Sequence, residues 1–355
     1  MKNEKIIYCY PIISSFIKKD LILLEKHFLL KHHSFKPYSK ISILIHFFSQ
    51  LFFLLKNSWN SKIFICRFVG YHSFLPGLFG YLFNKPVLYI LGGGECHSFP
   101  EFNYGGFKNK FYAKILKLSY RFATHLSPVH ESLIICNYQY DKSGGPKQGC
   151  LYFYPEIKAT YSAIYNGYDS EKFYNKNILR IPNSFITVAA NINGPEFYRK
   201  GIDLIIEIAK RHPELNFTII GNTSDKSLNI PTNIQLISSV PNDVLVDFLN
   251  QYEFYFQVSL AEGFPNALCE AMLCGCIPIG SDVFGIPFII DDSGFILKHR
   301  NIDELNEVVD NALKSDKSTL SLKATERIKN NFPISQREKE LLQIINQLMD
   351  GKSPK

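Results

Sequence analysis

Two glutamates, Glu262 and Glu270, lie on one segment with seven residues between them. The segment 259–280 reads S-L-A-E-G-F-P-N-A-L-C-E-A-M-L-C-G-C-I-P-I-G. Pro265 is typical of a first helical turn, where its missing N–H costs nothing, and Gly275 is typical of a helix end. We therefore expect a strand, a tight Glu-Gly turn, a short helix and a second strand.

This pattern gives the two carboxylates distinct chemistry. A helix start presents free amides and the positive end of its dipole, so the backbone of Gly263 to Asn266 could bind phosphate or sugar oxygens. Glu262 would lie at the mouth of that site. Glu270, further along the helix, could accept hydrogen bonds from paired hydroxyls such as those of a ribose. On periodicity alone, an amphipathic helix with one solvated and one capping carboxylate explains the pattern equally well.

Two cations form a second candidate site. Arg199 and Lys200 follow a predicted strand and a polar loop, and Gly201 then opens a helix with an apolar stripe. Cations beside a helix start form a phosphate clamp, and Lys200 is the stronger candidate because Gly201 lets the backbone approach closely. The alternative is a pair of solvated charges, which the helix dipole disfavours by a few tenths of a kcal/mol.

A glycine-rich loop forms the third candidate. Gly92, Gly93 and Gly94 follow a buried strand and precede Glu95 and His97. The loop lacks the spacing of a dinucleotide or P-loop fingerprint. Glu95 or His97 could bind a sugar hydroxyl or relay a proton; equally, Glu95 could cap the next segment and His97 could be a loop residue.

The elements that must position these residues alternate between strand and helix. Such alternation predicts parallel sheets covered on both faces, and the ligands of such sheets bind beyond the carboxyl ends of the strands. The length of 355 residues favours two domains. We expect an α/β protein of two Rossmann-like, doubly wound domains that face each other across a cleft. The first covers 1–170 and the second 180–332; the closing helix, 335–350, crosses back to cap the first. The predicted strands are 6–10, 63–68, 87–91, 126–129, 185–190, 217–221, 234–238, 254–258, 277–280 and 295–297, and the predicted helices are 18–32, 41–56, 73–83, 108–123, 201–212, 242–250, 303–313 and 320–330. The Asn-Gly turn in 164–169 marks the domain boundary.

The charge is divided unevenly between the halves. Residues 1–170 hold 20 Lys and Arg against 9 Asp and Glu, a balance of 20 − 9 = +11, whereas residues 171–355 hold 19 against 23, a balance of 19 − 23 = −4. A basic half suits an anionic membrane surface or a phosphorylated substrate, or else presents only solvated helix faces. No zinc-finger pattern, RNP motif or arginine-rich arm occurs, so we expect no nucleic-acid partner.

Cysteine usage and hydropathy bear on location. The eight cysteines form no CxxC pair and no metal-ligand spacing, which favours reduced thiols in the cytoplasm. The N-terminus resembles a first strand and has no signal-peptide pattern. The apolar run 41–55 is shorter than the roughly 20 residues that span a bilayer. It is a core helix or, alternatively, an interfacial helix lying on a membrane.

Together these motifs resemble glycosyltransferase family 4, the retaining nucleotide-sugar glycosyltransferases of GT-B fold. The resemblance rests on E-G-F-P-N-A-L-C-E-A-M with the following G-C-I-P-I-G, on R-K-G-I-D at 199–203, on I-Y-N-G-Y-D at 164–169 and on S-P-V-H-E-S-L at 127–133. It covers most of 85–300 in the expected order. The two glutamates with seven residues between them are its most specific part.

The resemblance implies a role for each candidate residue. Glu262 contacts the donor sugar and Lys200 neutralises the diphosphate, with Glu95 and His97 as further catalytic candidates. Glu270 binds the nucleotide ribose. The remaining donor-binding candidates are Arg199, Gly263, Phe264, Pro265, Asn266 and Ala267, with Asn222, Ser239 and Val240 beside the base.

The resemblance also implies an activity. The chain would transfer a sugar, with retention of configuration, from a nucleotide-diphosphate sugar to a glycan or lipid-linked acceptor in bacterial surface polysaccharide synthesis (lipopolysaccharide, capsule or exopolysaccharide). It would use no cofactor and no metal. It would be cytoplasmic, with peripheral contact to an anionic inner membrane face as a further possibility. The alternatives are a sugar-nucleotide epimerase of the same fold and a non-catalytic nucleotide-sugar-binding protein.

Overall fold

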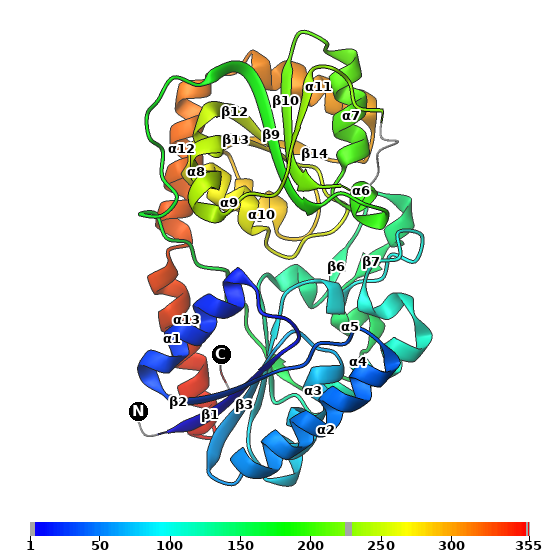
Figure 1. Cartoon of the computed structure of the whole chain (residues 1–355), viewed down its shortest axis with the longest axis vertical. Coiled ribbons are helices and arrows are strands. Elements are labelled where there is room, and N and C mark those ends of the chain that lie inside the picture. The colour runs from blue at the N-terminus through cyan, green and yellow to red at the C-terminus, as the bar shows by residue number, and fades with distance from the viewer. Residues whose placement is uncertain (1–3, 224–228, 353, 355) are drawn as a thin grey trace.

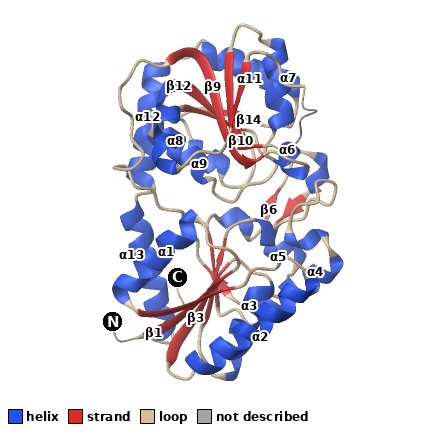
Figure 2. Ribbon diagram, in the orientation of Figure 1, coloured by secondary structure: helices blue, strands red, loops and turns tan. Residues whose placement is uncertain are grey.

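The computed structural model describes residues 4–223, 229–352 and 354 and consists of two α/β domains, one above the other (Figure 1). Each domain is built on one six-stranded sheet, and every pairing within the two large sheets is parallel. Helices cover both faces of each sheet (Figure 2). The predicted α/β class with two doubly wound domains is confirmed.

The first domain has the strand order β2-β1-β3-β4-β5-β8. Its chain order reverses between β1 and β3, which places a ligand crevice at the carboxyl ends of those two strands. Its strands are β1 (Lys5–Tyr10), β2 (Leu29–Ser34), β3 (Ser61–Arg67), β4 (Val87–Leu91), β5 (His125–Pro128) and β8 (Thr160–Tyr161), and its main helices are α1 (Ser15–His27), α2 (Lys40–Asn57), α3 (Tyr71–Leu82) and α4 (Lys110–Tyr120). A short helix α5 (Cys150–Phe153) and a small antiparallel pair, β6 (Cys136–Asn137) and β7 (Lys147–Gln148), complete it.

The second domain has the strand order β11-β10-β9-β12-β13-β14. Numbered from its own first strand this order is 3-2-1-4-5-6, and it reverses between β9 and β12. Its strands are β9 (Ile181–Asn191), β10 (Asn216–Asn222), β11 (Ile234–Ile237), β12 (Tyr252–Gln257), β13 (Ile277–Ser281) and β14 (Phe295–Leu297). Its helices are α6 (Pro195–Arg199), α7 (Ile202–Arg211), α8 (Asn242–Gln251), α9 (Asn266–Leu273), α10 (Ile286–Ile290), α11 (Ile302–Leu313) and α12 (Lys317–Asn331).

Aromatic stacking fixes the centre of the second sheet. The ring of Phe185 on β9 lies 5.2 Å from Phe217 on β10, and 4.9 Å and 5.1 Å from Phe254 and Phe256 on β12. All four side chains are buried. Offset aromatic pairs of this kind add to the hydrophobic gain from burial. The strands on both sides of the reversal point therefore form one rigid platform, and the loops that follow them are fixed in place.

One predicted element is wrong. The helix expected over 18–32 ends at His27, and residues Leu29–Ser34 form the edge strand β2. Phe28 already has extended backbone angles, φ −132° and ψ 159°, and its buried ring contributes to the core. The segment L-L-K-H-H-S has neither a helical stripe nor a clear alternation, because an edge strand covered on one face needs few apolar residues.

The last helix returns to the first domain. Figure 1 shows α13 (Ile334–Met349) beside α1 and the first sheet, although α12 packs on the second domain. Arg337 on α13 donates to both carboxylate oxygens of Asp20 on α1, at 2.9 and 3.1 Å, and to the carbonyl of Tyr165 at 3.1 Å. Both charged side chains are buried, and the Tyr8 hydroxyl also donates to Asp20. This buried ion pair fixes α13 on the domain.

We expect Arg337→Leu to destabilise the first domain strongly. The change leaves the buried Asp20 carboxylate without its countercharge, and breaking a buried pair from one side costs about 3–5 kcal/mol. A urea titration followed by circular dichroism measures the loss. Lys339→Leu on the same helix is the control, because Lys339 is exposed and should shift the midpoint little. Equal midpoints for the two variants would contradict the role given to the pair.

Candidate functional site

The candidate residues of the second domain gather at its reversal point. Lys200 follows β9 and Glu262 follows β12, the two strands between which the chain order reverses. Across from them lies the glycine loop after β4. A side-chain carbon on Gly263 would lie 2.4 Å from the carbonyl oxygen of Gly92, so the two domains touch here and only glycine fits at residue 263. The predicted sites thus meet between the domains.

Arg199, Lys200 and Glu262 form one charged cluster. The Lys200 ammonium and the Arg199 guanidinium both donate to Oε1 of Glu262, the latter at 3.0 Å. Burial alone would raise the pKa of Glu262, but the Lys200 and Arg199 charges outweigh it and lower that pKa to about 2. Burial alone would lower the pKa of Arg199, but the Glu262 carboxylate and the other nearby groups outweigh burial and raise that pKa above its usual range, so the guanidinium stays charged.

The backbone around this cluster is closely packed. Gly201 has φ +69°, and a side-chain carbon there would lie 2.2 Å from the carbonyl oxygen of Val258 at the end of β12. The amide of Leu260 also donates to the carbonyl of Arg199 at 2.8 Å. The loops after β9 and β12 are therefore bound to each other. Gly201 is needed for its left-handed backbone and for this contact.

Arg199 is held on every side. Its Nε donates to Glu196 at 3.0 Å, its Nη1 donates to the carbonyl of Ala261 at 3.1 Å, and its guanidinium lies 4.8 Å from the centre of the Tyr104 ring. The Lys200 ammonium has Glu262 as its ion-pair partner, and the flexible lysine side chain can move the ammonium elsewhere. Arg199 is thus the positioning cation and Lys200 the adaptable one.

The residues at the helix start after Glu262 differ in burial: Gly263, Phe264 and Pro265 are buried, whereas Asn266 and Ala267 are half-buried. Phe264 is buried against Tyr165, Tyr168 and Phe332, with ring centres 5.2–6.3 Å away, so its side chain belongs to the core. Pro265 precedes the first helical residue instead of occupying it, and Asn266 and Ala267 form the first turn of α9.

The Asn-Gly segment at the domain boundary contacts this helix start. The amide of Asn166 donates to the carbonyl of Phe264 at 3.2 Å and to Oδ1 of Asn266 at 3.3 Å, and the Tyr168 hydroxyl donates to the same Oδ1 at 2.9 Å. The sequence indicated a boundary role alone for this turn. Its contacts show that it also positions the helix start.

Glu270 lies in an environment opposite to that of Glu262. Glu270 is 8% exposed, and its carboxylate accepts no hydrogen bond from any residue in the described ranges. Burial raises its pKa from the ordinary 4.5 to about 7, against the lowering effect of Lys19 and Lys172. Lys19 comes from α1 of the first domain, so a first-domain cation faces the helix that carries Glu270. A carboxyl of this kind can accept hydrogen bonds from a ligand.

The contacts of Glu95 in the glycine loop show that it caps its own segment, one of the alternatives that the sequence left open. Glu95 accepts hydrogen bonds from the amides of Gly92 and Gly93 at 2.7 and 3.2 Å, so its carboxylate caps its own loop. Burial raises the pKa of Glu95, and those amides oppose the shift. Glu95 also lines the cavity beside Glu262, which leaves one side of it available to a ligand.

His97 is fully buried, and neither ring nitrogen has a hydrogen-bond partner among the described residues. Its ring lies 4.1 Å from that of Phe284, centre to centre. Burial lowers the pKa of His97 to about 3, with the nearby Glu262 and Arg199 acting in opposite directions. A neutral imidazole that lies buried beside the cluster with both nitrogens unpaired makes no hydrogen bond that stabilises the described fold, so it remains a candidate for hydrogen bonding to a ligand.

Three candidates mark the outer part of the site. The amide of Ser239 donates to Oδ1 of Asn222 at 3.0 Å, which brings the carboxyl ends of β10 and β11 together, and Val240 is half-buried beside them. These residues lie on the side of β9 away from Glu262. The three therefore form a separate edge of the candidate site.

A cavity of about 410 Å³ connects the domains at the cluster. The second domain supplies Glu262 and Asn266, and the first supplies Arg67 and Tyr104. Neither Arg67 nor Tyr104 was predicted from the sequence. Arg67 had a signal, since it is a charge at the carboxyl end of a buried strand, whereas Tyr104 lies in a loop that no pattern distinguished. The other lining residues are Phe16, Phe68, Gly92, Gly94, Glu95, Asn166, Phe264 and Pro265.

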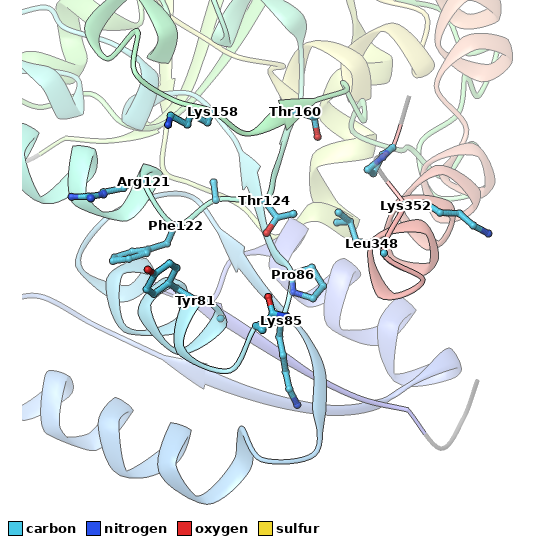
Figure 3. A pocket seen from close by; sticks show the side chains of 15 residues that line it. Tyr81, Lys85, Pro86, Arg121, Phe122, Thr124, Lys158, Thr160, Leu348 and Lys352 are labelled. Atoms are coloured by element: carbon cyan, nitrogen blue, oxygen red, sulfur yellow. The ribbon is translucent and has the colours of Figure 1, made fainter.

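A larger cavity lies elsewhere. It has about 700 Å³ and opens at the amino ends of β4, β5 and β8, opposite to the candidate site (Figure 3). Lys85, one of its cations, donates to the backbone carbonyls of Trp59 and Ser61, and in Figure 3 Lys85 and Lys352 point outward. Ligands of doubly wound sheets bind at the carboxyl ends, so this cavity is not the candidate site.

Clustered metal ligands, membrane-spanning helices and disulfides are absent from the described residues. Within residues 4–223, 229–352 and 354, no group of three or more His, Cys, Asp or Glu side chains is arranged to hold a metal ion. None of the helices in those ranges has the length and the apolar composition needed to cross a membrane. All eight cysteines are described, and none forms a disulfide.

Comparisons with known proteins give the family. Residues 194–331 match the model of the family described as glycosyl transferases group 1. One subunit of the human phosphatidylinositol N-acetylglucosaminyltransferase is 30% identical over 189 residues, 50% of this chain and 37% of that protein. The capsular polysaccharide biosynthesis glycosyltransferase CapH of Staphylococcus aureus is 31% identical over 137 residues, 35% of this chain and 37% of that protein. The matched part thus spans little more than a third of either relative's length.

A solved structure gives the fold. The structure of Anabaena Alr3699/HepE in complex with UDP and glucose aligns with a TM-score of 0.67 at 11% identity and covers 97% of this chain and 100% of that one. The likeness extends through both domains and thereby includes the first domain, which the family model does not reach. Residues 194–331 belong to the group 1 glycosyl transferases, and the chain as a whole has the two-domain GT-B fold.

Proposed function

We propose that the chain is a retaining glycosyltransferase that moves a sugar from a nucleotide-diphosphate sugar to a glycan or lipid-linked acceptor. The observation that carries this proposal is the cluster of Lys200, Arg199 and Glu262 at the reversal point of the second sheet, opposite the Gly92 loop. Two cations at that place suit a diphosphate. Family membership and the UDP and glucose of the Anabaena structure support the same class of donor.

The proposed reaction breaks the bond between the sugar carbon and the diphosphate oxygen. The acceptor hydroxyl attacks the same face of the sugar, and its proton passes to the departing diphosphate oxygen. Negative charge grows on that oxygen, and a preorganised cation stabilises the transition state more than the ground state. Lys200 carries this role, with Arg199 holding Glu262 toward the sugar. Glu270 receives the ribose hydroxyls of the nucleotide.

The pairing of Lys200 with Glu262 means that the donor must compete for the ammonium. Donor binding therefore has to redirect the ammonium from the carboxylate to the diphosphate, while Arg199 remains as the countercharge of Glu262. Arg199 donates to Glu196 through Nε and Nη2 and to Glu262 through Nη1, so its hydrogen bond to Glu262 remains when Lys200 moves away. The cluster can thus release the ammonium while Glu262 keeps one cationic partner.

We expect Lys200→Met to lower turnover by about 10²–10³-fold, the usual effect of removing one stabilising donor from a transition state. Release of nucleoside diphosphate measures it, after a thermal-shift screen with UDP-, GDP-, ADP- and CMP-sugars has identified the donor. Lys210→Met is the control, because Lys210 is an exposed residue of α7 paired with Glu207. Unchanged turnover in Lys200→Met, or epimerisation of the sugar nucleotide incubated alone, would refute the proposal.

We expect sugar-nucleotide binding to weaken as the pH falls below about 7. The Glu270 carboxyl has its pKa raised to about 7, so it takes up a proton in this range and loses its ability to accept two ribose hydrogen bonds. The dissociation constant should rise by up to tenfold per pH unit below 7. Calorimetric titration at pH 6, 7 and 8 measures the slope.

Glu270→Gln is the matched control for this titration. The variant should bind more weakly at pH 8 and lose the slope, while the protein without nucleotide becomes more stable there. The gain follows because the pKa of Glu270 is higher in the folded than in the unfolded protein. Ionisation of the carboxyl therefore begins to destabilise the folded state as the pH rises above the ordinary 4.5, and the full loss of stability is reached above about pH 7. Glutamine does not ionise, so the variant avoids this loss. A slope that persists in Glu270→Gln would assign the titration to another group.

The acceptor proposal rests on the relatives and on the first domain. One relative is named for phosphatidylinositol and another for capsular polysaccharide, which supports a glycan or lipid-linked acceptor. We retain a role in bacterial surface polysaccharide synthesis as the proposed setting. The proposed location is the cytoplasm, with peripheral contact to an anionic membrane face.

Helix α2 supports membrane contact. Its outward face is apolar, and the helix contains two lysines, Lys40 and Lys56, and no acidic residue. Figure 1 places α2 at the end of the first domain that is remote from the second. Apolar side chains framed by cations suit the interface of an anionic bilayer. The exposed large side chains of α2 are Ile41, Leu44, Ile45, Phe48, Phe52 and Leu55.

We expect the protein to float with vesicles of phosphatidylcholine and phosphatidylglycerol at low salt and less at high salt, because the attraction is partly electrostatic. Phe48→Glu should lower the floated fraction several-fold. Leu322→Glu, an equally exposed apolar residue on α12 of the second domain, should leave it unchanged. Equal flotation of both variants would exclude α2 as the contact surface.

A further inference from the structure

We propose, on the basis of the function proposed above, that the acceptor is an anionic lipid. Arg67 binds its anionic group in the cavity beside Glu262, and the groove between α2, α3 and α4 holds its hydrocarbon chain. Two independent features of the first domain carry this inference: a buried cation that no described carboxylate pairs, and an apolar groove linked to it through shared walls.

Arg67 lacks, within the described part of the chain, the partners that a buried guanidinium requires. It ends β3, is 2% exposed and lines the cavity that contains Glu262. Among the described residues, neither its Nε nor its Nη1 has a hydrogen-bond partner, and no carboxylate forms an ion pair with it. Its guanidinium lies 5.0 Å and 5.1 Å from the ring centres of Phe16 and Phe68, which hold it in place.

The carboxylates around Arg67 are already engaged. Asp20 accepts three hydrogen bonds from Arg337 and one from the Tyr8 hydroxyl. Glu95 is held by the amides of Gly92 and Gly93. Burial lowers the pKa of Arg67, and the charge of Asp20 opposes that shift. A buried, unpaired guanidinium nitrogen is costly, and an anion that enters the cavity satisfies it. Arginine binds phosphate by two parallel hydrogen bonds, so a phosphate ester fits this position.

The apolar groove lies on the outer side of the same domain. It has about 610 Å³, is bounded by α2, α3 and α4, and is lined almost entirely by carbon. Lys40 is the charged member of the described residues that line it. A groove of this size and composition suits a hydrocarbon chain, since each methylene removed from water adds to the free energy of binding. The apolar lining residues are Phe35, Ile43, Leu44, Phe47, Tyr71, Phe74, Phe111, Ile115 and Leu118.

A third cavity links the groove to the catalytic side. It has about 560 Å³, shares Tyr71 and Phe111 with the groove, and shares Phe68, Gly94 and Glu95 with the cavity beside Glu262. Consecutive cavities with common walls lead from apolar surroundings at α2 to charged surroundings at Arg67. Lys108 lines the middle cavity. The order of environments is that of an amphiphile, with a chain outside, an anion inside and the attacking hydroxyl next to the donor.

Location at the membrane favours a lipid over a soluble polyanion or a peptide. The groove opens beside the apolar face of α2, so a chain leaving a bilayer that contacts α2 enters it without crossing water. The basic balance of residues 1–170 attracts the anionic head groups of such a bilayer. A soluble glycan acceptor would leave the groove and its apolar walls without an occupant.

Binding of decyl phosphate to the full chain tests the proposal, with decyl glucoside, inorganic phosphate and UDP as comparison ligands. Calorimetry below the micelle concentration is the readout. We expect decyl phosphate to bind at least tenfold more tightly than either decyl glucoside or phosphate. Arg67→Met should remove the preference for decyl phosphate over decyl glucoside, whereas Lys62→Met on the same strand, an exposed cation, should keep it.

Two neighbouring residues separate the groove from the α2 face. Leu44 lines the groove and Ile45 does not, although the two are 59% and 62% exposed. Leu44→Glu should weaken binding of decyl glucoside by about tenfold or more, because a carboxylate in the groove opposes the chain. Ile45→Glu should leave it within twofold. Equal weakening in both variants would show that the chain binds to the α2 face and would overturn the groove.

Three results would overturn the inference. Decyl phosphate that binds no more tightly than phosphate would assign Arg67 to a free anion. Weaker binding of UDP in Arg67→Met would assign it to the donor. A marked fall in the melting temperature of Arg67→Met without ligand would make it structural, since loss of an unpaired buried charge should leave stability equal or higher.

The two proposals fail separately in this experiment. A chain that binds UDP normally and discriminates none of the amphiphiles would refute the lipid acceptor alone. A chain that binds no nucleotide or sugar nucleotide would refute the glycosyltransferase and the acceptor role that depends on it. Variants that unfold are recognised by their loss of UDP binding, which neither Leu44→Glu nor Ile45→Glu should change.

Discussion

The partly buried carboxylate of Glu262 determines how the centre of this protein is built. An anion that loses most of its contact with water must be paired, and here Arg199 and Lys200 supply the countercharges from another loop. That pairing requires the loops after β9 and β12 to approach closely, and the approach requires a residue without a side chain at Gly201. The order of strands, Gly201 and the two cations are therefore all needed to pair the Glu262 carboxylate.

The same residue type serves opposite purposes eight positions later. Glu262 is ionised because two cations outweigh the effect of burial on its pKa. Burial raises the pKa of Glu270, because the charges of Lys19 and Lys172 do not outweigh it. Environment thus divides the two carboxyls into one that is permanently charged and one that titrates near neutrality. Spacing in the sequence located both groups. It contained no information about this division, which depends on side chains 60 or more residues away, such as Arg199.

The second domain was more predictable from sequence than the first. Its strands are buried on both faces and separated by amphipathic helices, so apolar runs marked them; 295–297 was located to the residue. In the first domain β2 was missed because an edge strand needs few apolar residues. Arg67 was hidden inside a predicted strand, and Asn166 was assigned to a turn, because their roles arise from contacts across the domains. Local patterns locate elements, and tertiary contacts assign roles to loops.

The two domains divide the physical demands of a group transfer. A donor with a diphosphate needs fixed cations and a rigid platform, and the second domain provides them on strands locked by Phe185 and its neighbours. An amphiphilic acceptor needs a gradient from apolar to charged surroundings, and the first domain has one from α2 to Arg67. The excess of positive charge in residues 1–170 suits the proposed task, because a bilayer surface and an anionic head group are recognised by the same kind of side chain. A slightly acidic second domain is compatible with the proposed donor site, because a few partly buried cations such as Arg199 and Lys200 act at short range whatever the net charge of the domain.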